Sequence, residues 1–197
     1  MSNAVLEAIR TRRMVRALAD APVPREQVEQ ILESARWAPS AGNRRLHRFV
    51  AIQDPVTLRL LRMVSPGMFQ RPRAVIAICI DGQRARSFGM SPTARGLYVD
   101  VGTAAQTMLL AAHSIGLGAG VVTSFSRAAV SVVLNLPAGF SPEMFICLGF
   151  PAARQPPAIR PRTPVTWQAS ATGSAFPNRH PQHVRRSVRR NTGSPVT

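Results

Sequence analysis

Apolar positions in the first third of the chain recur at helical spacing between polar breaks. The stripe Val28, Ile31, Leu32 and Ala35 has the i, i+3, i+4, i+7 pattern of an amphipathic helix and predicts one over residues 25–37. A similar pattern predicts an earlier helix over residues 3–13. Asp54-Pro55 joins an N-cap residue to a first-turn proline, and so predicts a helix over residues 54–64.

Continuous apolar runs then predict strands. RAVIAICID, residues 73–81, has the two-sided apolar character of a central strand. Shorter candidates are residues 48–53, 118–125 and 144–150, with a helix over residues 126–134 between the last two. The longest helix is predicted over residues 97–115, ending at Gly116. Its apolar residues cover more than one face, so we expect it in a core or a subunit interface. The polar residues 82–96 predict a mobile loop.

The composition changes after Phe150. Residues 151–197 contain 8 of the 17 prolines and 8 arginines but no acidic residue. The 197 residues therefore predict one domain over residues 1–167, whose last part is an extended arm. Residues 168–197 have the composition of a disordered basic tail, and we expect residues 170–197 to be dispensable for ligand binding.

The cysteines and the hydropathy pattern indicate an ordinary cytoplasmic protein. Cys79 and Cys147 lie within strand-like runs, which favours two reduced core thiols over a disulfide or a metal pair. No apolar run reaches the ~18 residues that span a bilayer. The N-terminus lacks the pattern of a signal peptide.

The net charge of +16 raises the alternative of nucleic-acid binding. All 25 basic residues are arginine, which we attribute to coding bias rather than to function. VRRSVRR at residues 184–190 resembles a basic nucleic-acid-binding segment. However, no aromatic residue follows Phe176 to stack on bases, which makes a nucleic-acid partner the weaker hypothesis.

Four short motifs are candidates for a binding site. They are RTRRMVR with Arg12, Arg13 and Arg16; APSAGN with Pro39, Ser40 and Asn43; GLGAGVVTSF with Val121, Val122, Thr123 and Ser124; and RPR with Arg160 and Arg162. GLGAG follows a predicted helix rather than a strand, which is the wrong order for a dinucleotide-binding Rossmann turn. No metal-ligand spacing and no Ser-His-Asp set is present, so no catalytic residue is predicted.

In this order the motifs resemble the flavin-dependent nitroreductase family over residues 4–167. The resemblance implies an α+β FMN-binding fold, with a central mixed sheet flanked by helices and a C-terminal arm, in a homodimer. It implies that Arg12, Arg13, Arg16 and either Arg160 or Arg162 hold the FMN phosphate. The APSAGN turn would contact the flavin of the partner subunit, and residues 121–124 would line the ring.

The resemblance also implies an oxidoreductase. A reduced nicotinamide would donate hydride, and a small electron-poor acceptor such as a nitroaromatic or a quinone would take the electrons. The flavin would supply the redox chemistry, which explains why no acid–base set is visible. Met14, Arg45 and His47 stand where the family usually has serine, an amide and tryptophan, and these departures bear on the substrate class.

Two narrower alternatives remain open at this level. LRMVSPG, LLAAHSIGLGAG and VVTSFSRAAV are similar to the flavin subunit of cyclodipeptide oxidases, which works with a small partner protein. A flavin-storage protein without turnover would have the same motifs.

Overall fold

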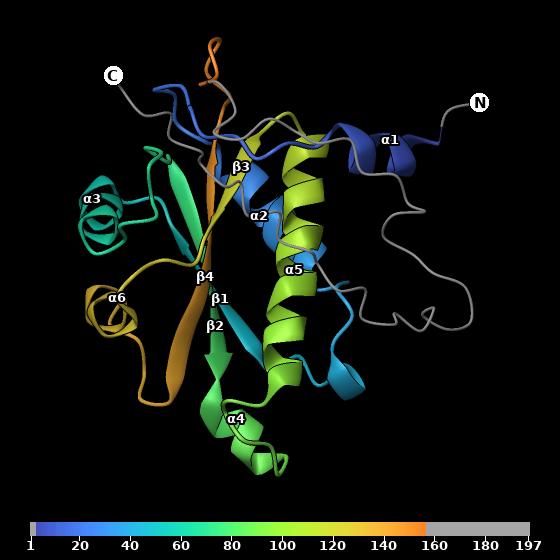
Figure 1. Cartoon of the computed structure of the whole chain (residues 1–197), viewed down its shortest axis with the longest axis vertical. Coiled ribbons are helices and arrows are strands. Elements are labelled where there is room, and N and C mark those ends of the chain that lie inside the picture. The colour runs from blue at the N-terminus through green and yellow to red at the C-terminus, as the bar shows by residue number, and fades with distance from the viewer. Residues whose placement is uncertain (1–2, 157–197) are drawn as a thin grey trace, which may run out of the picture. The chain divides into compact units, whose positions relative to one another are not determined.

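The computed structural model describes residues 3–156, which form a four-stranded sheet between two layers of helices (Figure 1). The strands are β1 (His47–Ile52), β2 (Ala74–Asp81), β3 (Gly118–Val122) and β4 (Phe140–Gly149), in the order β1-β2-β4-β3. The helices are α1 (Ala4–Thr11), α2 (Arg25–Ala35), the short 3-10 helix η1 (Ala41–Asn43), α3 (Pro55–Met63), α4 (Gly82–Ser87), α5 (Arg95–Ser114) and α6 (Arg127–Val133).

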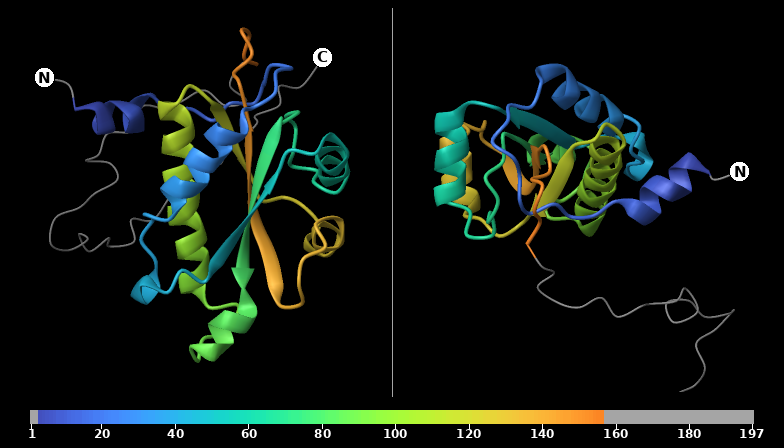
Figure 2. Two further views of the ribbon diagram at one scale, coloured as in Figure 1. Left: turned by 180° about the vertical axis from the view of Figure 1, so that it is seen from behind. Right: turned by 90° about the horizontal axis from the view of Figure 1, so that it is seen from above.

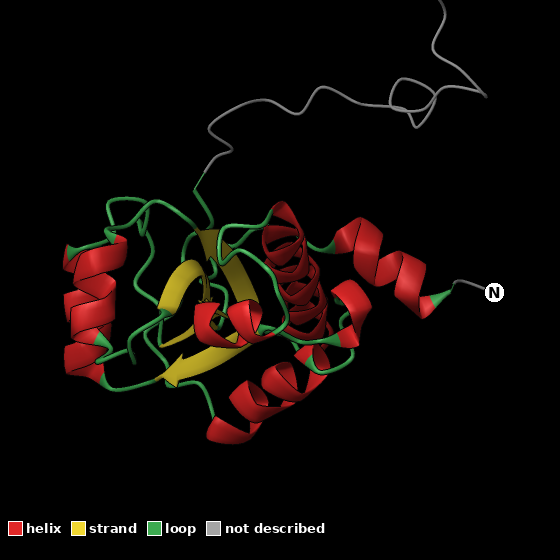
Figure 3. Ribbon diagram, turned by 90° about the horizontal axis from the view of Figure 1, so that it is seen from below, coloured by secondary structure: helices red, strands yellow, loops and turns green. Residues whose placement is uncertain are grey.

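Helices α2 and α5 cover one face of the sheet, and α3 and α6 cover the other (Figures 1 and 2). The view from below shows the same layers (Figure 3). Strand β2 is buried along its whole length because its side chains alternate between the two layers. Ile76, Ile78 and Ile80 join the core with α2 and α5, whereas Val75 and Cys79 join the core with α3 and α6. This two-sided burial is the reason for the continuous apolar run in the sequence.

The α+β class is confirmed, but the expected mixed sheet needs a correction. Each pair of named strands in the described chain is antiparallel. Parallel pairing there is confined to an isolated bridge between Met14 and Ala119. The segment that contains α3 leaves the end of β1 and enters β2 at the same end of the sheet, so β2 runs antiparallel to β1.

Several element boundaries also differ from those predicted; strand β3, for example, ends at Val122 rather than at residue 125. Helix α1 ends at Thr11 rather than at residue 13. Part of the predicted loop at 82–96 is helix α4, because the Asp81 carboxylate accepts a hydrogen bond of 2.9 Å from the Arg84 N–H and caps it. Strand β4 begins at Phe140, earlier than the apolar run indicated, because it pairs with all of β2.

The two cysteines are free and buried, as predicted. Burial raises the pKa of each thiol to about 12, so both stay protonated and unreactive.

Within residues 3–156, no helix is long and apolar enough to cross a membrane. Most of the predicted arm, the basic tail, Arg160 and Arg162 lie outside the described residues, which end at 156.

Candidate functional site

The basic segment after α1 is anchored to the sheet. Its backbone leaves the helical conformation at Arg12, where ψ is 135°. The Val15 N–H then donates to the Ala119 carbonyl on β3 at 2.9 Å. A contact of 2.9 Å between Thr11 Oγ1 and His113 Nε2 ties the same region to α5. Arg12 and Arg16 therefore do not share a helical face, because tertiary pairing with β3 replaces the last helical turn.

A cavity of about 300 Å³ lies beside this segment, between α1, the end of α5 and β3. Arg12, Arg13 and Val15 line it together with His113. The Arg12 Nη1 atom is buried and has no hydrogen-bond partner in the described chain. A buried donor without a partner costs about 1–3 kcal/mol, which an anion in the cavity would remove.

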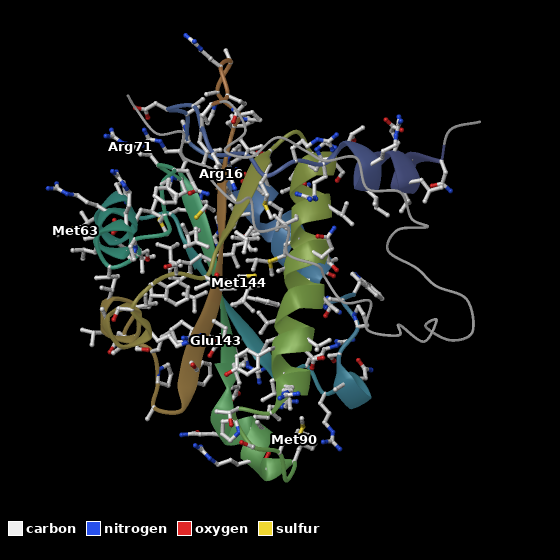
Figure 4. All side chains as sticks on the ribbon, viewed as in Figure 1. Arg16, Met63, Arg71, Met90, Glu143 and Met144 are labelled. Carbon is white, nitrogen blue, oxygen red and sulfur yellow. The ribbon has the colours of Figure 1, made fainter. Side chains whose placement is uncertain are left out.

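The other two predicted arginines of this motif are placed differently. Arg13 also lines the cavity, but its Nη1 donates to the carbonyls of Arg10 and Arg12 at 2.6 and 2.9 Å. Arg16 is exposed and is not part of the lining (Figure 4). Only Arg12 is thus preorganised for an anion, and the two others would have to reorient toward it.

The GLGAGVVTSF motif is strand β3 and the turn that follows it. Val121 and Val122 belong to the strand, where Val122 is buried, whereas Thr123 and Ser124 lie just beyond its end and are exposed. The Ser124 carbonyl accepts a hydrogen bond of 3.1 Å from the Gly67 N–H. The four predicted residues therefore follow one another along the edge strand, but Val121 packs on the α5 side of the sheet and Val122 on the α3 side.

Gln70 is a polar residue of this region that sequence analysis missed. Its side chain is buried against β3, where a Cβ on Gly120 would lie only 2.5 Å from Gln70 Nε2. A buried amide beside the predicted ring-binding edge is a candidate ligand donor. The MFQRPR segment contains no sequence signal for this role, because the contact comes from the packing of a loop on a distant strand.

The APSAGN turn lies in an unusual backbone conformation. Gly42, Asn43 and Arg45 have positive φ values of 57°, 53° and 49°. Non-glycine residues in this region are rare and persist where surrounding contacts hold them. Ser40 Oγ accepts a hydrogen bond of 3.2 Å from the Arg45 N–H, and the Asn43 side chain is exposed. The turn thus presents Asn43 outward from a fixed backbone.

Helix α5 supplies the contacts that hold this turn. The buried Asp100 carboxylate accepts from the Ala41 N–H at 3.0 Å, and the Thr103 hydroxyl donates to the Pro39 carbonyl at 2.9 Å. Sequence analysis missed Asp100. The signal was a lone acidic residue in an otherwise apolar helix, since such a carboxylate needs a partner when buried.

His47, which follows this turn on β1, is buried and neutral. Desolvation lowers its pKa, and this effect outweighs the opposing charge of Asp100. Its ring lies 5.0 Å from that of Phe49, measured between centroids. The imidazole therefore packs against an aromatic ring of the same strand.

The basic segment and the turn lie at opposite ends of α5. His113 contacts Thr11, next to Arg12, whereas Asp100 holds the turn. Asp100 and His113 are thirteen residues apart on α5, which is about 20 Å along the helix axis. Figure 1 shows α1 across one end of α5 and the 41–45 turn near the other. One chain therefore does not bring the two motifs into a single compact site.

Comparisons with known proteins identify the class that this fold and site define. The family model described as the nitroreductase family matches residues 9–75 and 61–150. The chain therefore belongs to the nitroreductase family.

Individual relatives agree. A Methanothermobacter thermautotrophicus protein described as an NADH dehydrogenase/NAD(P)H nitroreductase is 36% identical over 155 residues, covering 75% of this chain and 78% of that protein. The FMN reductase [NAD(P)H] of Bacillus subtilis is 29% identical over 180 residues, which cover 82% of this chain and 71% of that protein. A Desulfovibrio desulfuricans nitroreductase solved in complex with FMN superposes with a TM-score of 0.74 at 31% identity, covering 90% of this chain and 100% of that one.

Proposed function

We propose that the protein is an FMN-dependent oxidoreductase that transfers hydride from a reduced nicotinamide to a small electron-poor acceptor. The observation that carries this proposal is the buried, unpartnered Arg12 Nη1 at the wall of a cavity beside β3. Membership of the nitroreductase family supports the reaction class. The flavin reductases among its relatives and the relative bound to FMN support the cofactor.

The residues present fit a flavin phosphate and ring. Arg12 would donate to phosphate oxygens from the cavity wall. Arg13 and Arg16 would have to reorient toward the phosphate, and Arg160 or Arg162 are further proposed ligands. Charge-assisted hydrogen bonds of this kind are worth about 1.5–3 kcal/mol each. The edge formed by Val121, Val122, Thr123 and Ser124 would orient the ring, and the Gln70 amide would be available beside it.

Bound there, the flavin would accept and pass on hydride or electrons, and the protein would supply position and donors. The buried edge of β3 would exclude water from one side of the ring. His47 is buried and does not line this cavity.

We also propose that the complete site is formed by two copies of the chain. The separation of about 20 Å along α5 prevents the APSAGN turn from serving the cavity of its own chain. A second copy would bring its Pro39, Ser40 and Asn43 to that cavity. Helix α1 supports this assembly, because Val5, Leu6 and Ile9 are 51–65% exposed and the helix has no buried residue in the single chain.

The proposal is tested on the purified full-length protein. We expect a yellow protein that releases FMN on acid treatment and oxidises a reduced nicotinamide in the presence of a nitroaromatic or a quinone. Arg12→Ala should weaken FMN binding roughly 10- to 100-fold, because one charge-assisted contact is lost.

Arg10→Ala is the matched control, since Arg10 is exposed on α1 and already pairs with Glu7 at 2.8 Å. This variant should bind FMN as the wild type does. A colourless protein that also fails to bind added FMN would refute the proposal.

A further inference from the structure

A second cavity, of about 420 Å³, lies between α3 and the segment that precedes α2. Helix α3, the segment that leads into α2 and the residues that precede β2 enclose it. It shares no lining residue with the cavity at Arg12. The two are therefore separate sites, and the following argument does not depend on the proposed function.

Four arginines converge on this second cavity from two parts of the chain. Arg59 and Arg62 are three residues apart on α3 and so share a helical face. Arg71 and Arg73 precede β2, where the Arg73 N–H donates to the Leu148 carbonyl at 2.9 Å. Figure 4 shows Arg71 on the α3 side of the sheet.

Among the described residues, acidic side chains pair with one of these four arginines and leave three without an ion pair. Asp20 is the one acidic residue in the lining, and it pairs with Arg73. The Asp54 carboxylate, at the start of α3, accepts from the Thr57 N–H and hydroxyl at 2.7 Å each. Within residues 3–156, Arg59, Arg62 and Arg71 form no ion pair. Residues 151–197 contain no acidic side chain that would compensate.

The lining also contains donors and an apolar floor. Arg73 Nε is buried and has no hydrogen-bond partner in the described chain. Val23 and Leu58 are buried at the base, and Pro22, Pro55 and Pro72 add rigid apolar rings. A basic rim above an apolar base suits a ligand that is anionic at one end and flat and apolar at the other.

We propose that this cavity binds a small organic diphosphate of the size of a nucleoside diphosphate. Guanidinium groups bind phosphate oxygens in pairs, and two adjacent phosphates would satisfy arginines arriving from α3 and from the segment before β2. The volume lies within the range of about 300–1,000 Å³ that is typical of small-molecule sites. The apolar base would contact the ring system of the ligand.

The test is calorimetric titration of the full-length protein, with FMN added to saturation, with ADP, pyrophosphate and adenosine in turn. We expect ADP to bind more tightly than pyrophosphate, and adenosine not to bind measurably. The double variant Arg59→Gln/Arg62→Gln should lose at least tenfold in ADP affinity, because two charged donors are removed. Arg71→Gln alone should also weaken binding, and it provides a second variant in a loop rather than a helix.

The matched control is Arg84→Gln/Arg86→Gln on α4, which removes the same charge from an exposed helix away from the cavity. It should leave ADP affinity unchanged. An equal loss of ADP affinity in the control would show that ADP is attracted to surface charge in general, and would overturn the proposed site. Absence of ADP binding would also overturn it, whether or not FMN binds. Equal affinity for ADP and pyrophosphate would overturn the role of the apolar base.

Discussion

Burial, rather than a partner, sets the charge of His47. The side chain is 7% exposed, and its Nδ1 has no hydrogen-bond partner in the described part of the chain. Desolvation lowers its pKa below the ordinary value of 6.5, and the positive charge of Arg48 lowers it further. The carboxylate of Asp100 opposes this shift without reversing it. The folded protein therefore holds a neutral imidazole next to the strained turn.

We predict that mild acid destabilises the protein through this residue. Below pH 6.5 the unfolded chain protonates His47 before the folded chain does, so the free energy of unfolding falls as the pH drops. Well above pH 6.5 both states are neutral at this residue, and its contribution to the pH dependence disappears.

Urea unfolding at pH 7.5 and 5.5 measures the effect. Between pH 7.5 and 5.5, the free energy of unfolding of the wild type should fall by up to about 1.4 kcal/mol more than that of His47→Gln. His113→Gln retains His47 and should behave as the wild type. Equal losses in the wild type and in His47→Gln would contradict the prediction.

At the scale of elements, β3 depends on close approach to its neighbours. A Cβ on Gly120 would lie 2.5 Å from Gln70 Nε2 and 3.1 Å from the Val15 carbonyl oxygen. The Val15 backbone cannot move freely, because its N–H pairs with Ala119. This glycine therefore lets the basic segment and the Gln70 loop pack against the same strand.

Gly120→Ala should lower the free energy of unfolding by about 1–3 kcal/mol through overpacking. It should also weaken FMN binding, because Gln70 and the segment after Arg12 must shift. Gly96→Ala is the control, since its Cβ would meet nothing within 4 Å and the residue lies in α5. Thermal unfolding and FMN titration of both variants measure the difference. A Gly120→Ala protein as stable as Gly96→Ala would show that β3 has room for a methyl group.

At the scale of the whole molecule, the length of α5 separates the two motifs that the family pattern combines. If each site takes Arg12 from one copy and Asn43 from the other, FMN binding and dimerisation are thermodynamically linked. A ligand that binds only the dimer draws monomers into it by mass action.

Mixing Arg12→Ala with Asn43→Ala tests this arrangement. Each variant alone should bind FMN more weakly, Arg12→Ala more so because it loses a charged contact. After subunit exchange, each heterodimer should have one site with both changes and one site with neither. FMN titration of the mixture should then show tight binding at one of the two sites of each heterodimer. No recovery after demonstrated exchange would place both residues in a site formed by one chain.

The sequence by itself determined most of the long elements and the family. The stripe at Val28 and Ile31, the Asp54-Pro55 start of α3 and the run of β2 are local patterns, and each reports burial or capping within one element. The order of the four motifs predicted the nitroreductase family, and the family model, which matches residues 9–75 and 61–150, confirms it.

The tertiary structure alone decided which distant residues meet. Strand pairing ended α1 at Thr11 and separated Arg16 from the cavity at Arg12. The packing of α5 joined Asp100 to Ala41, and the path of the chain around α3 brought Arg59 to Arg71. None of these contacts has a local period to reveal it, because they depend on which faces pack together and on where the loops return the chain.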